Sequence, residues 1–214
     1  MKKINIPIPI DQEIILDPYK TIMSKTDKKG IIEYANDYFM EISGYKEWEL
    51  MGQPHNVIRH PDMPKIIFKL LWQRLDKGQN IHAIVKNLAK DGRYYWVVTD
   101  FQTGYDTEGN IIKYYSRRKA VPNNVRDYFS ELYKKIIEIE RVGGMEASGA
   151  YLSGLLAENN SSYDKFILDI FNLSEKELDK YMKAQINDAD LGIENITPEV
   201  LIKKSKKKKL FKFF

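Results

Sequence analysis

A thirteen-residue stretch, residues 52–64, concentrates side chains that could bind a polar or charged ligand. It reads Gly-Gln-Pro-His-Asn-Val-Ile-Arg-His-Pro-Asp-Met-Pro. Proline fixes φ and keeps the residue before it out of the helical region, so we expect a stiff loop. Such a loop could hold Arg59, His60 and Asp62 in one geometry around an anionic ligand. The alternative is a surface loop whose charges are only solvated.

Strand and helix patterns alternate around this loop. Residues 21–27 and 31–34 are typical of two strands joined by a turn. Asn36 is placed to cap a short helix that ends at Gly44, and a helical turn follows. After the loop, apolar residues at helical spacing predict a helix over residues 64–77, with core positions that include Phe68 and Trp72. Three further strands are expected, over residues 81–88, 94–103 and 111–118.

The pattern becomes helical from Asn123 onward. An amphipathic stripe runs to a Gly-Gly pair at 143–144, and the sequence beyond it favours three more helices, of which the last begins at a capping box. We expect an N-terminal cap (1–17), a sensor domain (18–121), an amphipathic output helix (122–142), a helical extension (143–195) and a basic-aromatic tail (196–214).

Two strands, a run of short helices and three strands within about 100 residues predict an α+β protein with the PAS fold. This is a five-stranded antiparallel sheet with short helices on one face. The residues that carry the resemblance are Asn36, Ser43-Gly44-Tyr45, the loop itself, and the segments Ile84-Val85-Lys86-Asn87 and Tyr95-Trp96-Val97. With these strings, residues 10–140 resemble the PAS sensor of the bacterial aerotaxis, or energy-taxis, family.

The resemblance implies a non-covalently bound FAD and a signal that depends on its redox state. It also implies a cofactor site made of Asn36, Arg59, His60, Asp62, Phe68, Trp72 and Asn87. The residue chemistry agrees, since a guanidinium suits phosphate or a ring carbonyl and an amide suits the edge of an isoalloxazine ring. Structural alternatives stay open: an ion pair that fixes the loop, a core tryptophan at 72, and a strand-end cap at Asn87.

The remaining histidines are assigned to structure. His55 is expected to serve the loop backbone, and His82 lies out of phase with Asn87 on its strand. The three histidines match no zinc spacing, and we expect neither a metal site nor catalytic residues.

Composition narrows the class further. The sequence has no cysteine, which excludes disulfides, thiolate metal sites and a cysteinyl-flavin adduct. The net charge of +4 does not indicate a nucleic-acid partner. No apolar run approaches the roughly 20 residues of a membrane span, so we expect a cytoplasmic protein.

Two departures from the family shape the expected function. Ile81 stands where relatives commonly place a tryptophan, which could weaken flavin retention. The aerotaxis receptor continues into membrane spans and a signalling hairpin, whereas this chain is expected to be a stand-alone form. It would therefore relay its signal to a membrane-bound methyl-accepting chemotaxis receptor in trans. The Lys203–Phe214 tail could hold it at the inner membrane face, and a homodimer is a further candidate.

Two other functions are weighed against this one. The first is a PAS module without flavin that senses another ligand or only binds proteins, and Ile81 is its main support. The second is a flavoenzyme, for which the sequence supplies no acid or base at the ring.

Overall fold

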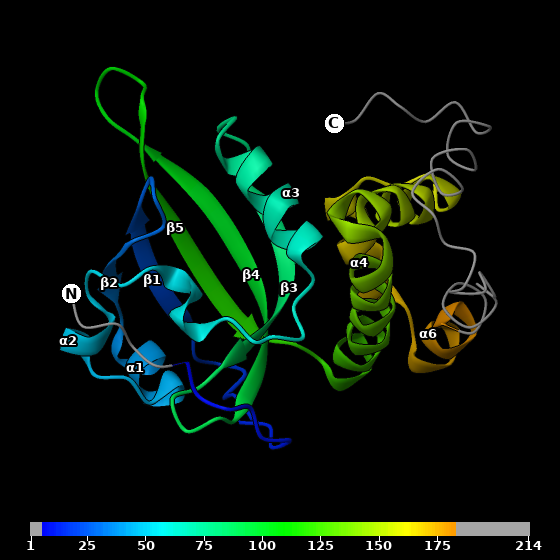
Figure 1. The fold of residues 1–214 in the computed structure, drawn as a ribbon, viewed down its shortest axis with the longest axis horizontal. Helices are drawn as coiled ribbons and strands as arrows, with labels where there is room; N and C mark the ends of the chain where they lie inside the picture. Colours follow the sequence, from blue (N-terminus) through cyan, green and yellow to red (C-terminus); the bar gives the residue numbers. More distant parts are fainter. Residues whose placement is uncertain (1–5, 183–214) are drawn as a thin grey trace. The chain divides into compact units, whose positions relative to one another are not determined.

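The computed structural model describes residues 6–182, and the first part of this range forms one twisted sheet (Figure 1). Every strand pair is antiparallel, in the order β2-β1-β5-β4-β3. The strands are β1 (Ile22–Asp27), β2 (Ile32–Ala35), β3 (Ile81–Leu88), β4 (Tyr94–Tyr105) and β5 (Ile111–Ala120). The α+β class and the five-stranded PAS-type sheet predicted from the sequence are confirmed.

Short helices lie between β2 and β3: α1 (Asp37–Ser43), α2 (Glu47–Leu50), the 3₁₀ turn η1 (His55–Ile58) and α3 (Lys65–Leu75). Asn36 caps α1 as expected, because its Oδ1 accepts the Phe39 N–H. The helix ends at Gly44, where φ is 73°, a conformation that costs glycine little.

One face of the sheet carries the residues that matter for the site. Side chains alternate along a strand, and directly paired residues share a face. Asn87 pairs with Tyr95, and Thr99 pairs with Arg118. These four residues, together with Ser24 and Ser116, therefore line a single face, which we call the inner face. Each of them is buried.

The second part of the chain is helical. It consists of α4 (Asn123–Glu158), α5 (Tyr163–Asn172) and α6 (Glu175–Met182). The helix α4 is broken at Gly144, with φ 70° and ψ −174°, a region open to glycine. The break falls at the predicted end of the amphipathic stripe, and it separates two arms of α4.

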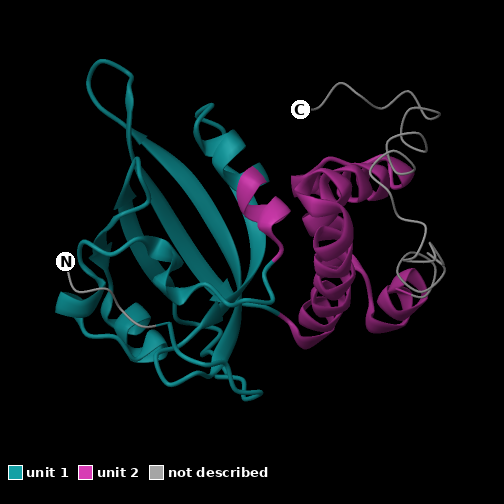
Figure 2. Cartoon of the chain, viewed as in Figure 1, with its two compact units in different colours: residues 1–63, 70–121 teal, residues 64–69, 122–214 magenta. Residues whose placement is uncertain are grey.

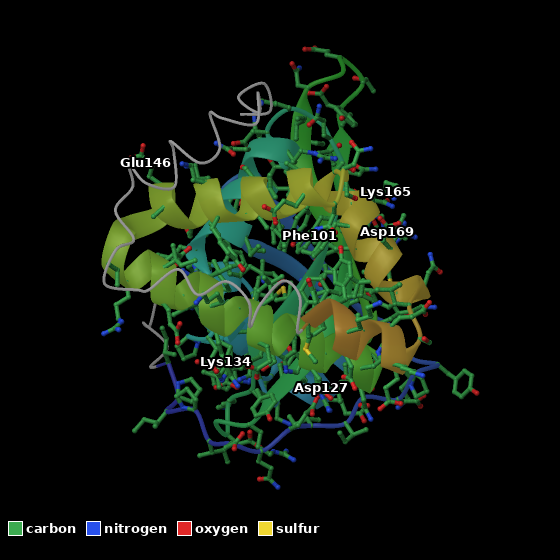
Figure 3. The ribbon with its side chains drawn as sticks, turned by 90° about the vertical axis from the view of Figure 1, so that its right-hand side faces the viewer. Phe101, Asp127, Lys134, Glu146, Lys165 and Asp169 are labelled. Atoms are coloured by element: carbon green, nitrogen blue, oxygen red, sulfur yellow. The ribbon has the colours of Figure 1, made fainter. Side chains whose placement is uncertain are left out.

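Aromatic residues hold the helical part together. Phe129 contacts Tyr128, Tyr133 and Phe166, with ring centroids 5.4 to 6.2 Å apart. Lys165 and Asp169 lie side by side on α5 and form an exposed ion pair of 2.6 Å (Figure 3). Their spacing of four residues places both groups on the same helix face.

The chain divides into two compact units (Figure 2). The first comprises residues up to 63 with 70–121, and the second comprises 64–69 with the residues from 122 onward. The first turn of α3 thus groups with the helical unit, which the sequence-based boundaries do not anticipate. Within residues 6–182, none of the helices has the length and apolar character needed to span a bilayer.

Candidate ligand-binding site

The loop of residues 52–64 is fastened to the sheet by its own backbone. Ile31 forms a bridge with Pro54, and Arg59 forms a bridge with Asn87 at the β3 edge. The half-buried Arg59 also closes the loop on itself, since its Nη2 donates to the Met63 carbonyl at 3.1 Å. The stiff loop that the prolines predict is therefore held at both ends.

His60 is almost fully buried, with 3% of its surface exposed. Its Nδ1 accepts the Asp62 N–H at 3.1 Å, and its ring lies edge-on to Tyr94. Burial, helped by the nearby Lys86 ammonium, lowers the pKa of His60 to about 4, and the Asp62 carboxylate opposes this shift without overcoming it. His60 is thus a neutral imidazole at pH 7, with its proton on Nε2.

Asp62 is tied to a residue that the sequence reasoning missed. Its Oδ2 lies 2.7 Å from the Lys86 Nζ, and that ammonium lies 4.2 Å from the centre of the Tyr94 ring. The Asp62 side chain is 60% exposed, so this is an ion pair at the protein surface. We call His60, Asp62, Lys86 and Tyr94 the loop fastener.

Asn87 stands on the other side of β3. It is 4% exposed, and its Nδ2 has no hydrogen-bond partner among the described residues. A buried donor left in this way costs about 1–3 kcal/mol. The hydroxyls of Tyr95 and Thr99 on the same face share this condition. Unsatisfied buried polar groups need an explanation, and an absent ligand is one that the chemistry fits.

Arg118 adds a buried positive charge to this face. It is 2% exposed and donates to Ser24 Oγ, Ser116 Oγ and His55 Nε2 at 2.6 to 3.1 Å. None of these partners carries a negative charge. Burial lowers the pKa of Arg118 to about 10, which leaves it cationic at pH 7. A buried cation with only neutral partners favours a ligand that supplies an oxygen acceptor or negative charge.

The half-buried His55 contacts this group through its ring, in addition to the loop-backbone role expected of it. Its backbone N–H does donate to the Gly30 carbonyl, but its ring stacks on Phe39 and its Nε2 accepts from Arg118. Burial, and then the charge of Arg118, hold the pKa of His55 well below its usual value. The Arg118 guanidinium also lies 5.5 Å over the Phe39 ring, so α1 and η1 cover the inner face at this point.

The other expected site residues have contacts elsewhere. Asn36 uses Oδ1 to accept two backbone N–H groups and Nδ2 to reach the Thr21 carbonyl, so it joins α1 to β1. Trp72 is 37% exposed and lies edge-on to Tyr114. Phe68 is half-buried and belongs to the turn that groups with the helical unit. Their assignment to a ligand site stays a prediction.

The structure divides the predicted site in two. Lys86 and Tyr94 point away from the inner face, because each lies one residue from Asn87 or Tyr95 on its strand. His60 and Asp62 contact these outward side chains, whereas Asn87 faces inward. The bridge between Arg59 and Asn87 joins the two groups. Arg118 shares a face of β5 with the buried Tyr114 and Ser116, but the sequence alone does not show which of the adjacent Arg117 and Arg118 faces inward.

Comparisons with known proteins show which families and proteins this chain is similar to. The PAS fold family matches residues 32–117. The chain is 41% identical over 130 residues to the aerotaxis receptor of Escherichia coli K12, which covers 61% of this chain and 26% of that protein. It is 26% identical over 110 residues to the biofilm dispersion protein BdlA of Pseudomonas aeruginosa, covering 50% of this chain and 26% of that protein. The chain thus spans about a quarter of either relative.

Among solved structures, the light state of the blue-light photoreceptor Aureochrome1 LOV is similar, with a TM-score of 0.47 and 20% identity. The match covers 52% of this chain and 87% of that one.

Residues 32–117 therefore match the PAS fold, which agrees with the five-stranded antiparallel sheet of the structure. The similarity to the aerotaxis receptor extends over 130 residues, more than the length matched by the PAS fold family. The resemblance to the PAS sensor of the aerotaxis family, expected from the sequence motifs, is confirmed.

Proposed function

We propose that the PAS domain binds FAD and senses redox or respiratory status. Three observations support this proposal: the similarity to the aerotaxis receptor, the unsatisfied buried Asn87 amide and the buried Arg118 cation. The Asn87 amide carries the argument: its residue is 4% exposed, and a ligand would supply the acceptor that its Nδ2 does not find among the described residues.

The residues present fit a flavin. Bound FAD would supply a reversible redox change in its ring system. Asn87 Nδ2 and the Tyr95 hydroxyl would donate hydrogen bonds to the ring edge, since burial raises the pKa of Tyr95 and keeps its proton in place. Arg118 would stabilise negative charge that increases on reduction. The chain's own role is to orient the ring, exclude water from it and respond to its charge.

The loop residues would serve the same ligand from the outside. Arg59, His60 and Asp62 keep the loop against the β3 edge and so determine the position of Asn87. Asn36, Phe68 and Trp72 complete the set that the family resemblance assigns to the cofactor. We propose that these three residues support the fold around the ligand, since Asn36 and Trp72 are engaged in contacts of their own.

We further propose that the signal passes by protein contact to a membrane-bound chemotaxis receptor. The similarity to a receptor for aerotaxis supports a partner of this kind. A cytoplasmic location at the inner membrane face agrees with it, and the Lys203–Phe214 tail, which lies outside the described residues, would add attraction to anionic lipid. Binding of the full chain to anionic but not neutral vesicles, lost when the tail lysines are replaced by glutamine, tests this part.

A flavin-free sensor is the second candidate. Ile81 favours it, because this isoleucine, in the position of a family tryptophan, is 1% exposed and already part of the packed core. The same inner face would then take a smaller polar ligand with an oxygen acceptor.

The visible absorbance of the purified protein separates the two candidates. FAD binding predicts the bands of a bound flavin, directly or after incubation with FAD, and release of FAD on denaturation. A colourless protein that takes up no FAD contradicts the redox proposal. Steady-state oxidation of NAD(P)H well above that of free flavin would instead favour a flavoenzyme.

A further inference from the structure

A carboxylate of α4 holds the beginning of α3. The N–H groups of Lys65 and Ile66 donate to the two carboxylate oxygens of Glu140 at 3.0 and 2.7 Å. The first N–H groups of a helix have no partner within it, and the helix dipole favours negative charge there. Glu140 therefore caps α3 from about 75 residues further along the chain.

Both arms of α4 meet this turn of α3. Glu140 precedes the break at Gly144, and Ser148 follows it. The fully buried Ser148 donates to Glu140 Oε1 at 3.2 Å and so orients the carboxylate. The neighbouring Gly149 admits Ile66, whose Cδ1 lies 3.2 Å from the place a Cβ would occupy. We call this arrangement the α4 elbow, and all its contacts lie within the second unit.

The chain that enters the elbow comes directly from the ligand loop. Met63 accepts two hydrogen bonds there: its carbonyl from Arg59 Nη2 and its sulfur from the Lys86 N–H. Only Pro64 separates this fixed point from Lys65. Proline permits little rotation about φ, so the connection between Met63 and the capped turn is short and restricted.

We propose that Glu140 is a positioning residue that couples the ligand loop to the helical unit. Release of the Glu140 cap loosens the loop at Met63, and release of Met63 loosens the cap, as linkage requires. The conformation of the α4 elbow would therefore change when the conformation of the loop changes. The inference rests on the proposed function only for the identity of the ligand, because the coupling is a property of the ligand-free protein.

Hydrogen exchange of the ligand-free full chain tests the coupling. In Glu140→Gln, the amides of Lys65 and Ile66 should exchange about fivefold faster, the effect of losing a typical helix cap. The amides of Asp62 and Met63, which are bonded to His60, should also exchange faster. The matched control Glu138→Gln, an exposed glutamate on the same helix, should change none of them.

The reverse experiment perturbs the loop. Arg59→Gln removes the guanidinium that holds the Met63 carbonyl, and exchange at Lys65 should rise although the elbow is unaltered. Ser148→Ala provides a milder release of Glu140 if Glu140→Gln disturbs the helical unit. If exchange rises only at Lys65 and Ile66, Glu140 caps α3 without affecting the loop, and the coupling is refuted. If exchange at these two amides does not change, Glu140 does not cap α3 either. If the protein binds no flavin, the redox proposal is refuted. The exchange experiments still test the coupling, because they are made on the ligand-free protein.

Discussion

The two faces of the β3–β4 hairpin hold polar groups in opposite conditions. On the outer face, the members of the loop fastener satisfy one another: Lys86 meets Asp62 and the Tyr94 ring, and the neutral His60 accepts a backbone N–H. On the inner face, Asn87 and Tyr95 have groups without a hydrogen-bond partner within residues 6–182, and the hydrogen-bond partners that Arg118 has there are neutral. A satisfied cluster is complete without a ligand, whereas an unsatisfied one is stabilised by gaining one. We therefore propose that the inner face recognises the ligand and that the loop fastener anchors the loop.

Replacing Arg118 is expected to have the largest effect. Arg118→Met keeps the aliphatic stem but removes the buried cation, and FAD affinity should fall about 100-fold, the value of one or two charge-assisted hydrogen bonds. The neighbouring Arg117 is exposed and pairs with Asp100, so Arg117→Met is the matched control and should bind FAD as the wild type does. Equal affinities of the two variants, measured by fluorescence titration, would remove Arg118 from the site.

The pH dependence of stability reports on the fastener. The pKa of His60 is about 4 in the folded state and about 6.5 when unfolded, so the unfolded chain binds the proton more tightly between these values. Stability is therefore complete above pH 6.5 and decreases as the pH falls toward 4, by about 2 kcal/mol between pH 7 and pH 4.5. Urea unfolding at several pH values should show a shallower slope for His60→Gln than for the wild type. An identical slope would mean that His60 titrates normally.

A substitution at Asn87 tests whether this residue contacts the ligand or only belongs to the core. Asn87→Leu replaces an unsatisfied amide by apolar groups of similar size, so the free energy of unfolding of the flavin-free protein should rise by about 1 kcal/mol. The same substitution should lower FAD affinity about tenfold. Gln79→Leu, at an exposed amide just before β3, is the control for both measurements. A loss of stability without any loss of affinity would make Asn87 structural.

The smallest effect is expected at the exposed ion pair. Asp62→Asn removes its charge, but the Asp62 side chain is 60% exposed and the pair is screened by solvent. The expected cost is about 0.5 kcal/mol in urea unfolding, and it should diminish further at high salt. A fall in FAD affinity as large as that of Arg118→Met would place direct ligand contacts in the fastener and so reverse the comparison.

Much of the fold could be predicted because local signals agree with it. The strand over 81–88, the Asn36 cap and the helix end at Gly44 follow from patterning and turn residues. The site was harder to predict. The charged loop is easily chosen as a candidate site because of its residue types. Which face of the sheet its side chains contact, however, depends on the register of the strands. Arg118 was missed because an arginine in a strand is usually exposed, and its burial becomes clear only beside Ser24 and His55.

The turn of residues 64–69 shows a different limit of sequence reasoning. Its apolar spacing predicts a helix, and it does begin α3. It groups with the helical unit, where Glu140, about 75 residues away, accepts its first N–H groups, and no local pattern encodes a partner at that distance.

The side-chain amide signal of Asn87, followed by nuclear magnetic resonance while FAD is added, tests the central claim most directly. If the inner face recognises the flavin, the Asn87 Nδ2 signals should shift and become protected from exchange in proportion to the flavin bound. The Asn80 amide, on the surface, should not respond. Binding of FAD that shifts the signals of the loop fastener while Asn87 stays exchangeable and unshifted would contradict the account.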